Sequence, residues 1–391
     1  MSILAMMMLG QLTRVNISPQ IAFYWHDVAI VFFVLLTLPK YLVRMFRNPI
    51  LYHKSIILSS LVVIFAVFSW YINRIYTITP LLYGGRLLAY VIFGWLLKKE
   101  KLFETKEWQQ LLLIFFTGLA ILGLGQYFCC PDTRFLEGMG WDDHYYRLIG
   151  TWFDPAFTAL GLVLGWLWVH LVAKNGLLKL NKSWARKIEL LLLLALILTY
   201  SRSGYLATGG CALLLLGQNK ERRERVTNRK YWLGVVIAAV VASGIYSYLA
   251  WKHPSDSTNL LRTNSIVART EMLQQQLQAF NGGQWLYGRG VFVPLKQTVP
   301  SDSLTSEMKK TAAFPDNFEI LLVSFLGLPL MLGLCWLIVA KMLKWWQTGD
   351  ERFYYAVATL VCAQFNQAVL QPFILLTLIM LENEHFSRDK S

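Results

Sequence analysis

The chain has 391 residues, of which 55% are apolar and only 15% are charged. A soluble domain of average composition carries about 25% charged residues, so this chain has too little charge to cover a water-facing surface. Its apolar residues also gather in runs of roughly 15–25, the length that crosses a hydrocarbon core of about 30 Å. The composition excludes a soluble enzyme and a disordered chain, and we expect a polytopic membrane protein.

Apolar segments recur along the whole chain and predict an all-α transmembrane bundle of about eleven or twelve spans. The number depends on Pro372, because a proline can either separate two short passes or kink one helix. We expect helices with short loops over 1–250, one large extracytoplasmic loop over 251–315 and C-terminal helices over 316–391, all in a single integral-membrane domain. The segments fall at about 1–17, 19–39, 55–72, 79–97, 108–128, 154–173, 188–200, 203–217, 231–250, 316–343, 353–370 and 371–382.

The connections between these segments alternate in charge. Five of them hold 22 Lys or Arg against 7 Asp or Glu, namely 40–54, 98–107, 174–187, 218–230 and 341–352. The others hold 11 against 10, namely 73–79, 129–154, 199–204 and 251–316. An excess of lysine and arginine marks the cytoplasmic side. We therefore expect a multi-pass protein of the cytoplasmic (inner) membrane, with its N-terminus inside and the second group of loops in the periplasm.

The same alternation explains the net charge of +14. The excess Lys and Arg lie in the loops expected at the inner face of the membrane, next to its lipids. Nucleic acid is not an expected partner. The five cysteines and six histidines form no spacing typical of a metal site, so no metal and no cofactor are expected.

Arg202 lies near the middle of the apolar stretch 188–217, in LTYSRSGYL. Basic loops flank both ends of this stretch, so the chain has to cross outward and return within it. Arg202 then lies at the outer end of a helical hairpin with short arms. A cation held at membrane depth is costly and indicates function by default; the alternative is an arginine that extends to the headgroups.

The large outer loop contains a predicted helix, SIVARTEMLQQQLQAF. Its apolar side chains form one stripe at helical spacing, and Arg269 lies beside that stripe. Arg269 is therefore directed either toward a ligand at the membrane body or into a structural ion pair.

After this loop, Pro315-Asp316-Asn317 precedes a long apolar helix. Asp316 with Glu319 resembles a capping box in which Asp replaces Ser or Thr. Asp316 is thus either a helix cap or a functional carboxylate. A position at the helix N-terminus favours its charged form and weakens it as a base.

The loop over 129–154 is rich in aromatic and acidic residues, which predict either sugar binding or an interfacial aromatic belt. Arg147 and Asp154 lie close to the following span and can face the same cavity as the residues above. Arg289, in the turn-prone GGQWLYGRG, and Arg86, in the middle of a span, are further candidate cations.

Five motifs stand in a characteristic order: RLIGTWFDP, TYSRSGYL, NSIVARTEM, NGGQWLYGRG and PDNFEILLVSFLG. In this order, around one large outer loop, they resemble the O-antigen ligase / O-antigen polymerase superfamily. The resemblance covers roughly residues 145–335. It implies a metal-independent membrane glycosyltransferase of the GT-C type, which transfers glycan from a polyprenyl-diphosphate-linked donor to a hydroxyl of a glycan or lipid acceptor on the outer side.

The resemblance also implies residue roles. The arginines of the SR-x-G turn and of the outer-loop helix, here Arg202 and Arg269, grip the donor diphosphate. Ligase-like members carry His-Asn where this chain has Asp316-Asn317, so Asp316 is the candidate base or acceptor orienter, and the departure favours a polymerase. Residues of a second group are candidate substrate ligands: Arg147, Asp154, Arg289, Arg86 and Asn317.

Two other functions remain open. A transporter or channel for an anionic solute would also explain short helical arms around Arg202. A non-catalytic scaffold for cell-envelope assembly would follow if Asp316 only caps its helix.

Overall fold

The computed structural model describes residues 2–18, 21–47, 70–71, 79–100, 106–139, 141–176, 181–217, 258–260, 264–278, 280, 282–293 and 315–383. They belong to two compact units. The first unit comprises Met1–Leu111, Ala268–Asp350 and Leu375–Ser391, and the second comprises Leu112–Val267 and Glu351–Ile374.

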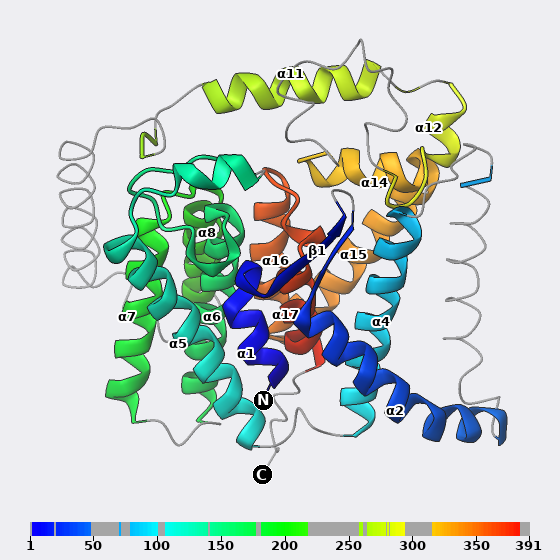
Figure 1. Ribbon diagram of the computed structural model, residues 1–391. Helices are drawn as coiled ribbons and strands as arrows, with labels where there is room; N and C mark the ends of the chain where they lie inside the picture. Colours follow the sequence, from blue (N-terminus) through cyan, green and yellow to red (C-terminus); the bar gives the residue numbers. More distant parts are fainter. Residues whose placement is uncertain are drawn as a thin grey trace. The chain divides into compact units, whose positions relative to one another are not determined.

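Helices make up most of the described chain (Figure 1). In chain order the elements are α1 (Ser2–Leu9), η1 (Gly10–Thr13), β1 (Arg14–Ser18), β2 (Ile21–Tyr24), α2 (Trp25–Arg47), α4 (Thr79–Lys99), α5 (Lys106–Cys129), η4 (Arg134–Met139), η5 (Gly150–Trp152), α6 (Pro155–Asn175), α7 (Lys182–Leu198), α8 (Arg202–Gly217), α11 (Asn264–Gln278), α12 (Gln284–Tyr287), α14 (Phe318–Leu326), α15 (Leu328–Thr348), α16 (Arg352–Ala363), η8 (Ala368–Leu370) and α17 (Pro372–Asn383).

Five of the described helices are long and apolar enough to cross a membrane: α2, α4, α5, α6 and α15. Three shorter apolar helices lie at Ser2–Thr13, Arg352–Ala363 and Pro372–Glu382. The predicted all-α polytopic class is confirmed. The predicted span 231–250 and most of 55–72 lie outside the described residues.

The predicted first span, 1–17, is wrong as a single helix. Helix α1 and the short η1 end at Thr13, and Arg14–Ser18 forms strand β1, which pairs antiparallel with β2. The reason lies in the sequence RVNIS, where polar and apolar residues alternate with the period of two that favours a strand. This hairpin leads directly into α2.

Helix α6 is the centre of the second unit, and α7, α8 and α16 pack against it. Nearly all of its side chains from Pro155 to Val172 are buried. Gly161 lets the fully buried ring of Trp152 approach so closely that a Cβ at this position would lie 2.6 Å from it. The predicted hairpin over 188–217 is confirmed as α7 and α8, joined by a three-residue turn (Figure 1).

The C-terminal apolar segment is interrupted, as expected for two short passes. Helix α16 ends at Ala363, the short η8 follows, and α17 begins at Pro372. Proline suits the first position of a helix, where its missing N–H leaves no bond unmade.

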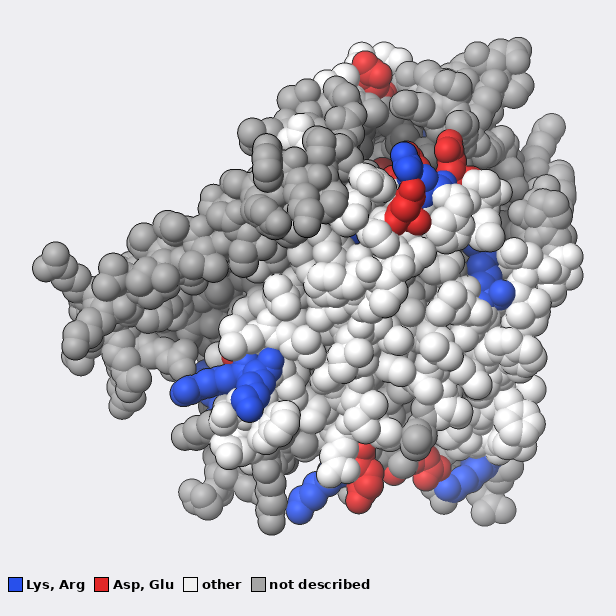
Figure 2. All heavy atoms as spheres, turned by 60° about the vertical axis from the view of Figure 1, so that its left-hand side comes forward, with Lys and Arg blue, Asp and Glu red and all other residues white. Residues whose placement is uncertain are grey.

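The outer faces of the helices are apolar. Side chains of α15 such as Leu332, Trp336 and Leu337 are more than half exposed. Figure 2 shows a broad band without charge on one face, with most of the described charged side chains gathered toward its two margins. Such a distribution is expected where acyl chains cover the band and headgroups meet the margins.

Candidate active site

The turn that carries Arg202 joins two helices of the second unit. Helix α7 ends at Leu198, and Tyr200 takes a left-handed conformation with φ of 50°. The Ser201 carbonyl accepts from the Tyr205 N–H at 3.0 Å, and the Ser201 hydroxyl accepts from the Gly204 N–H at 3.4 Å. Ser201 is therefore the N-cap of α8.

Arg202 is the first residue of α8 and is half-buried. One of its guanidinium nitrogens, Nη1, lies 3.5 Å from the Leu260 carbonyl oxygen. A helix N-terminus carries a partial positive charge, so a cation there destabilises the helix. Both the guanidinium charge and the helix terminus attract an anion at this position. The position is costly for folding and well suited to phosphate.

Arg147 is buried and supports this turn from the preceding outer segment. Its Nε donates to the Thr199 carbonyl at 2.7 Å and its Nη2 to the Tyr200 carbonyl at 3.2 Å. These carbonyls end α7, where a cation is favourable. Arg147 is predicted as a substrate ligand, and the structure places these two donors on the turn that leads to Arg202.

Asp154 is the N-cap of α6. Its Oδ1 accepts from the N–H of Ala156 at 2.7 Å and of Phe157 at 2.9 Å. Burial raises the pKa of the Asp154 carboxyl from 3.8 to about 6, and nearby Asp142 also raises it, against the opposing effects of the capping hydrogen bonds and of Arg147. A carboxyl that titrates near pH 6 can exchange a proton under physiological conditions.

Sequence reasoning missed a polar contact on α8. Asn366, buried in the break between α16 and η8, has its Nδ2 3.5 Å from the Ser203 hydroxyl, which itself lies 3.2 Å from the Ser201 hydroxyl. The detectable signal was the polar run QFNQ inside an apolar segment.

The predicted outer-loop helix is confirmed as α11, and Arg269, in its second turn, belongs to the first unit. Phe280 follows the helix and is buried in a cluster with Leu322 and Val323 of α14 and Met331 of α15. The apolar stripe thus ends on the membrane helices, as expected.

Arg289 is buried between α11 and α14. Its Nη2 donates to the Gln276 carbonyl at 3.0 Å, its backbone N–H donates to the Ser324 carbonyl at 2.7 Å, and its guanidinium lies 4.1 Å from the centre of the Phe280 ring. Burial lowers the pKa of Arg289 to about 10, which leaves it charged at neutral pH. In these contacts Arg289 joins the last turn of α11 to α14.

The predicted capping box at Asp316 is wrong by one residue. Asn317 is the N-cap of α14, because its Oδ1 accepts from the Ile320 N–H at 3.1 Å. Asn317, predicted as a substrate ligand, therefore has a structural role, and Asp316 lies just before the cap. Asp316 is therefore not the N-cap of α14.

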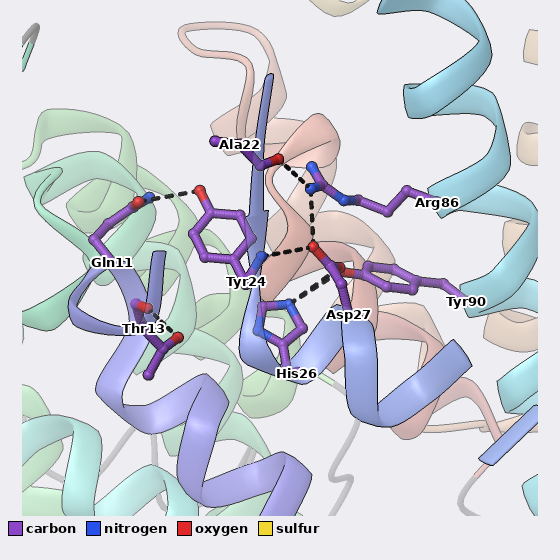
Figure 3. Close-up of polar contacts among 9 residues, drawn as sticks. Gln11, Thr13, Ala22, Tyr24, His26, Asp27, Arg86 and Tyr90 are labelled. Carbon is purple, nitrogen blue, oxygen red and sulfur yellow. Dashed lines mark hydrogen bonds and ion pairs between the residues drawn. The ribbon is translucent and has the colours of Figure 1, made fainter. Parts of the chain in front are cut away.

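Arg86 lies in a polar network at the β-hairpin (Figure 3). Its Nη2 lies 2.8 Å from Oδ2 of Asp27 and donates to the Ala22 carbonyl at 3.0 Å. Asp27 also accepts from the Tyr24 N–H at 3.0 Å and from the Tyr90 hydroxyl, and the buried His26 lies 2.9 Å from that hydroxyl. Arg86 is thus neutralised within the protein. Asp27, its partner, was not singled out from the sequence.

The candidates divide between the units. Arg147, Asp154 and Arg202 lie in the second unit, whereas Arg86, Arg269, Arg289, Asp316 and Asn317 lie in the first. The convergence of Arg202 with Arg269 and Asp316 stays a prediction.

Fold and candidate site define a polytopic helical membrane protein with cations and carboxylates at its helix termini. Residues 189–335 match the family model described as O-antigen ligase. The match confirms, over this part of the chain, the resemblance to the O-antigen ligase / O-antigen polymerase superfamily that the motifs indicate. Neither a curated protein nor a solved structure matches the chain.

Proposed function

We propose that this protein is a glycosyltransferase of surface-polysaccharide assembly. It transfers or polymerises glycan from a polyprenyl-diphosphate-linked donor onto a hydroxyl of a glycan or lipid acceptor, without a metal ion. The family match supports an O-antigen ligase-type role in polysaccharide assembly, and the motif order favours this donor. The reaction takes place on the periplasmic side of the inner membrane, where the charge alternation predicts that the turn of Arg202 lies.

The observation that carries the proposal is the position of Arg202. A guanidinium at the N-terminus of α8 is unfavourable for the helix and favourable for an anion. The diphosphate gains negative charge as the glycosidic bond breaks, so cations directed at it stabilise the transition state more than the ground state. Arginine suits this role because its planar fork binds phosphate oxygens in pairs and stays charged.

Arg269 supplies the second cation in this proposal, and Asp316 orients the acceptor hydroxyl or takes its proton. Arg269 is proposed from the motif, and Asp316 from the motif together with its position beside the α14 cap.

The proposal is tested with purified protein in proteoliposomes, given a polyprenyl-diphosphate oligosaccharide and a glycan acceptor. Arg202→Ala and Arg269→Ala should each reduce transfer by about 100-fold or more, because each removes a charged donor from the developing anion. Arg186→Ala is the matched control, since Arg186 is an exposed arginine near the other end of the same helical hairpin. Full transfer by both Arg202→Ala and Arg269→Ala would refute the proposal.

A transporter for an anionic solute is the second candidate, favoured by the short arms α7 and α8 around Arg202. Uptake of radiolabelled phosphate or pyrophosphate by the same proteoliposomes, with no lipid-linked glycan present, would support it in place of transfer.

A further inference from the structure

Asp154 uses only one of its two carboxylate oxygens for the helix. Oδ1 accepts both capping hydrogen bonds. Oδ2 has no hydrogen-bond partner among the residues that the structure describes, and the side chain is half-buried. A cap alone therefore leaves a partly enclosed oxygen that can accept a hydrogen bond from something else.

The helix that Asp154 begins lies beside the helix that Arg202 begins. Gly204, in the first turn of α8, packs on Ala159 in the second turn of α6 so closely that a Cβ on Gly204 would lie 2.8 Å from that of Ala159. Figure 1 shows α6 and α8 side by side. Ala159 is five residues from Asp154, about 7.5 Å along a helix. The N-termini of α6 and α8, and with them Asp154 and Arg202, therefore lie at the same end of this unit.

Arg147 links the two termini. It contacts the carbonyls of Thr199 and Tyr200 just before Arg202, and its charge acts on the Asp154 carboxyl. Arg147, Asp154 and the turn before Arg202 thus lie together at one end of the second unit.

We propose that Asp154 is the general base of the transfer, an inference that rests on the proposed function. The acceptor hydroxyl gives its proton to Oδ2 of Asp154 while its oxygen bonds to the anomeric carbon of the donor sugar. The bond from that carbon to the donor diphosphate breaks, and its electron pair stays on the diphosphate, next to Arg202. Asp154 afterwards releases the proton to water. Asp316 is then left to orient the acceptor.

The charges around Asp154 decide the pH range. Asp142 and Arg147 act on it most strongly, and Arg202 lies in the first turn of the packed α8. Among the described residues, Glu351, beside α16, bonds Asn175 at the opposite end of α6 and so lies far from Asp154. Because the pKa of the Asp154 carboxyl is raised to about 6, the base is charged at neutral pH and is lost by protonation below about pH 6. A bound diphosphate would raise this pKa further.

The test substitutes Asp154→Asn in the full chain and measures transfer from pH 5 to 9 in the proteoliposome assay. Asparagine caps a helix as well as aspartate does, so α6 keeps its cap and loses only the base. We expect kcat to fall by about 100-fold or more, with little change in the donor KM, and the acid limb near pH 6 in kcat/KM to disappear. Glu137→Gln, an exposed carboxylate in the same outer loop, is the control and should behave as the wild type.

A variant Asp154→Asn that keeps more than about a tenth of the activity and the same acid limb would overturn the proposal. If Asp154→Asn does not fold, Asp154→Ser, which also caps the helix, is tested in its place. The same two measurements then decide the role of Asp154: the residual activity and the acid limb of the pH profile. Failure of the wild type to transfer glycan would refute the proposed function itself. Active Asp154→Asn beside inactive Arg202→Ala would refute only the role of Asp154.

Discussion

Single arginines in this chain have different roles that the sequence does not distinguish. Arg202 could be singled out because basic loops on both flanks place it at the end of a hairpin. Arg147 was recognised as a candidate, but its bonds to Thr199 and Tyr200 span more than fifty residues of sequence. No local pattern predicts such a contact, because packing of α6 and α7 creates it.

The role of Arg147 predicts the effect of replacing it. Arg147→Met keeps an apolar stem and leaves two buried carbonyls without their charged donor, so we expect the free energy of unfolding to fall by roughly 2–4 kcal/mol. The turn that presents Arg202 should loosen, and the donor KM should rise. Arg147→Lys keeps the charge but not the planar guanidinium, so it should restore part of the stability and part of the donor affinity.

Thermal denaturation of the purified protein in detergent measures the loss of stability, and the transfer assay measures the rise in the donor KM. Arg134→Met is the control, because Arg134 is exposed and its ion pair with the nearby Asp132 is exposed as well. An unchanged thermal midpoint and donor KM in Arg147→Met would show that its hydrogen bonds contribute neither stability nor position.

At the scale of elements, hydropathy predicts helices well and their ends poorly. The hairpin α7–α8 followed from its apolar runs and basic flanks, and helix α11 followed from its apolar stripe. Pro372 left either a break or one kinked helix open, and the structure shows the break. The strand after Thr13 was not predicted, because a window dominated by apolar residues hides a short alternation. The cap at Asn317 was missed by one residue, since both Asp and Asn suit an N-cap and only the bond to the Ile320 N–H separates them.

The network of Asp27 and Arg86 fastens the hairpin, α2 and α4 to one another (Figure 3). Breaking a buried ion pair on one side leaves an uncompensated charge, which costs about 3–5 kcal/mol, whereas removing both charges can be nearly neutral. The Asp27–Arg86 pair is partly buried, so we expect a smaller loss of the same sign. Asp27→Asn should therefore lower the thermal midpoint. The double variant Asp27→Asn/Arg86→Met should recover most of the loss.

A double-mutant cycle on thermal stability makes this measurement. Lys40→Met is the control, because the pair of Lys40 with Glu100 is exposed and such pairs contribute little. If the double variant were no more stable than Asp27→Asn alone, charge neutralisation would not be the function of the pair.

At the scale of the whole molecule, the distribution of charge carries most of the information about function. Composition identified a membrane protein and loop charges predicted its orientation, because both follow from the transfer of side chains between water and lipid. Composition and loop charges do not predict which distant loops form one site. Arg202 and Arg269 could be named from motifs, but whether they share one site depends on how helices pack, which no charge count contains.

The predicted orientation can be tested with the native cysteines. Cys129 and Cys130 are exposed at the end of α5, in a loop expected on the periplasmic side, whereas Cys211 and Cys362 are buried. A membrane-impermeant maleimide added to intact spheroplasts should therefore label the wild type, and Cys129→Ser/Cys130→Ser should abolish that labelling. A cysteine placed at the exposed Lys187 of this double variant should react only after the membrane is opened. The reverse pattern would invert the topology and put the turn of Arg202 in the cytoplasm, where a periplasmic transferase could not use it.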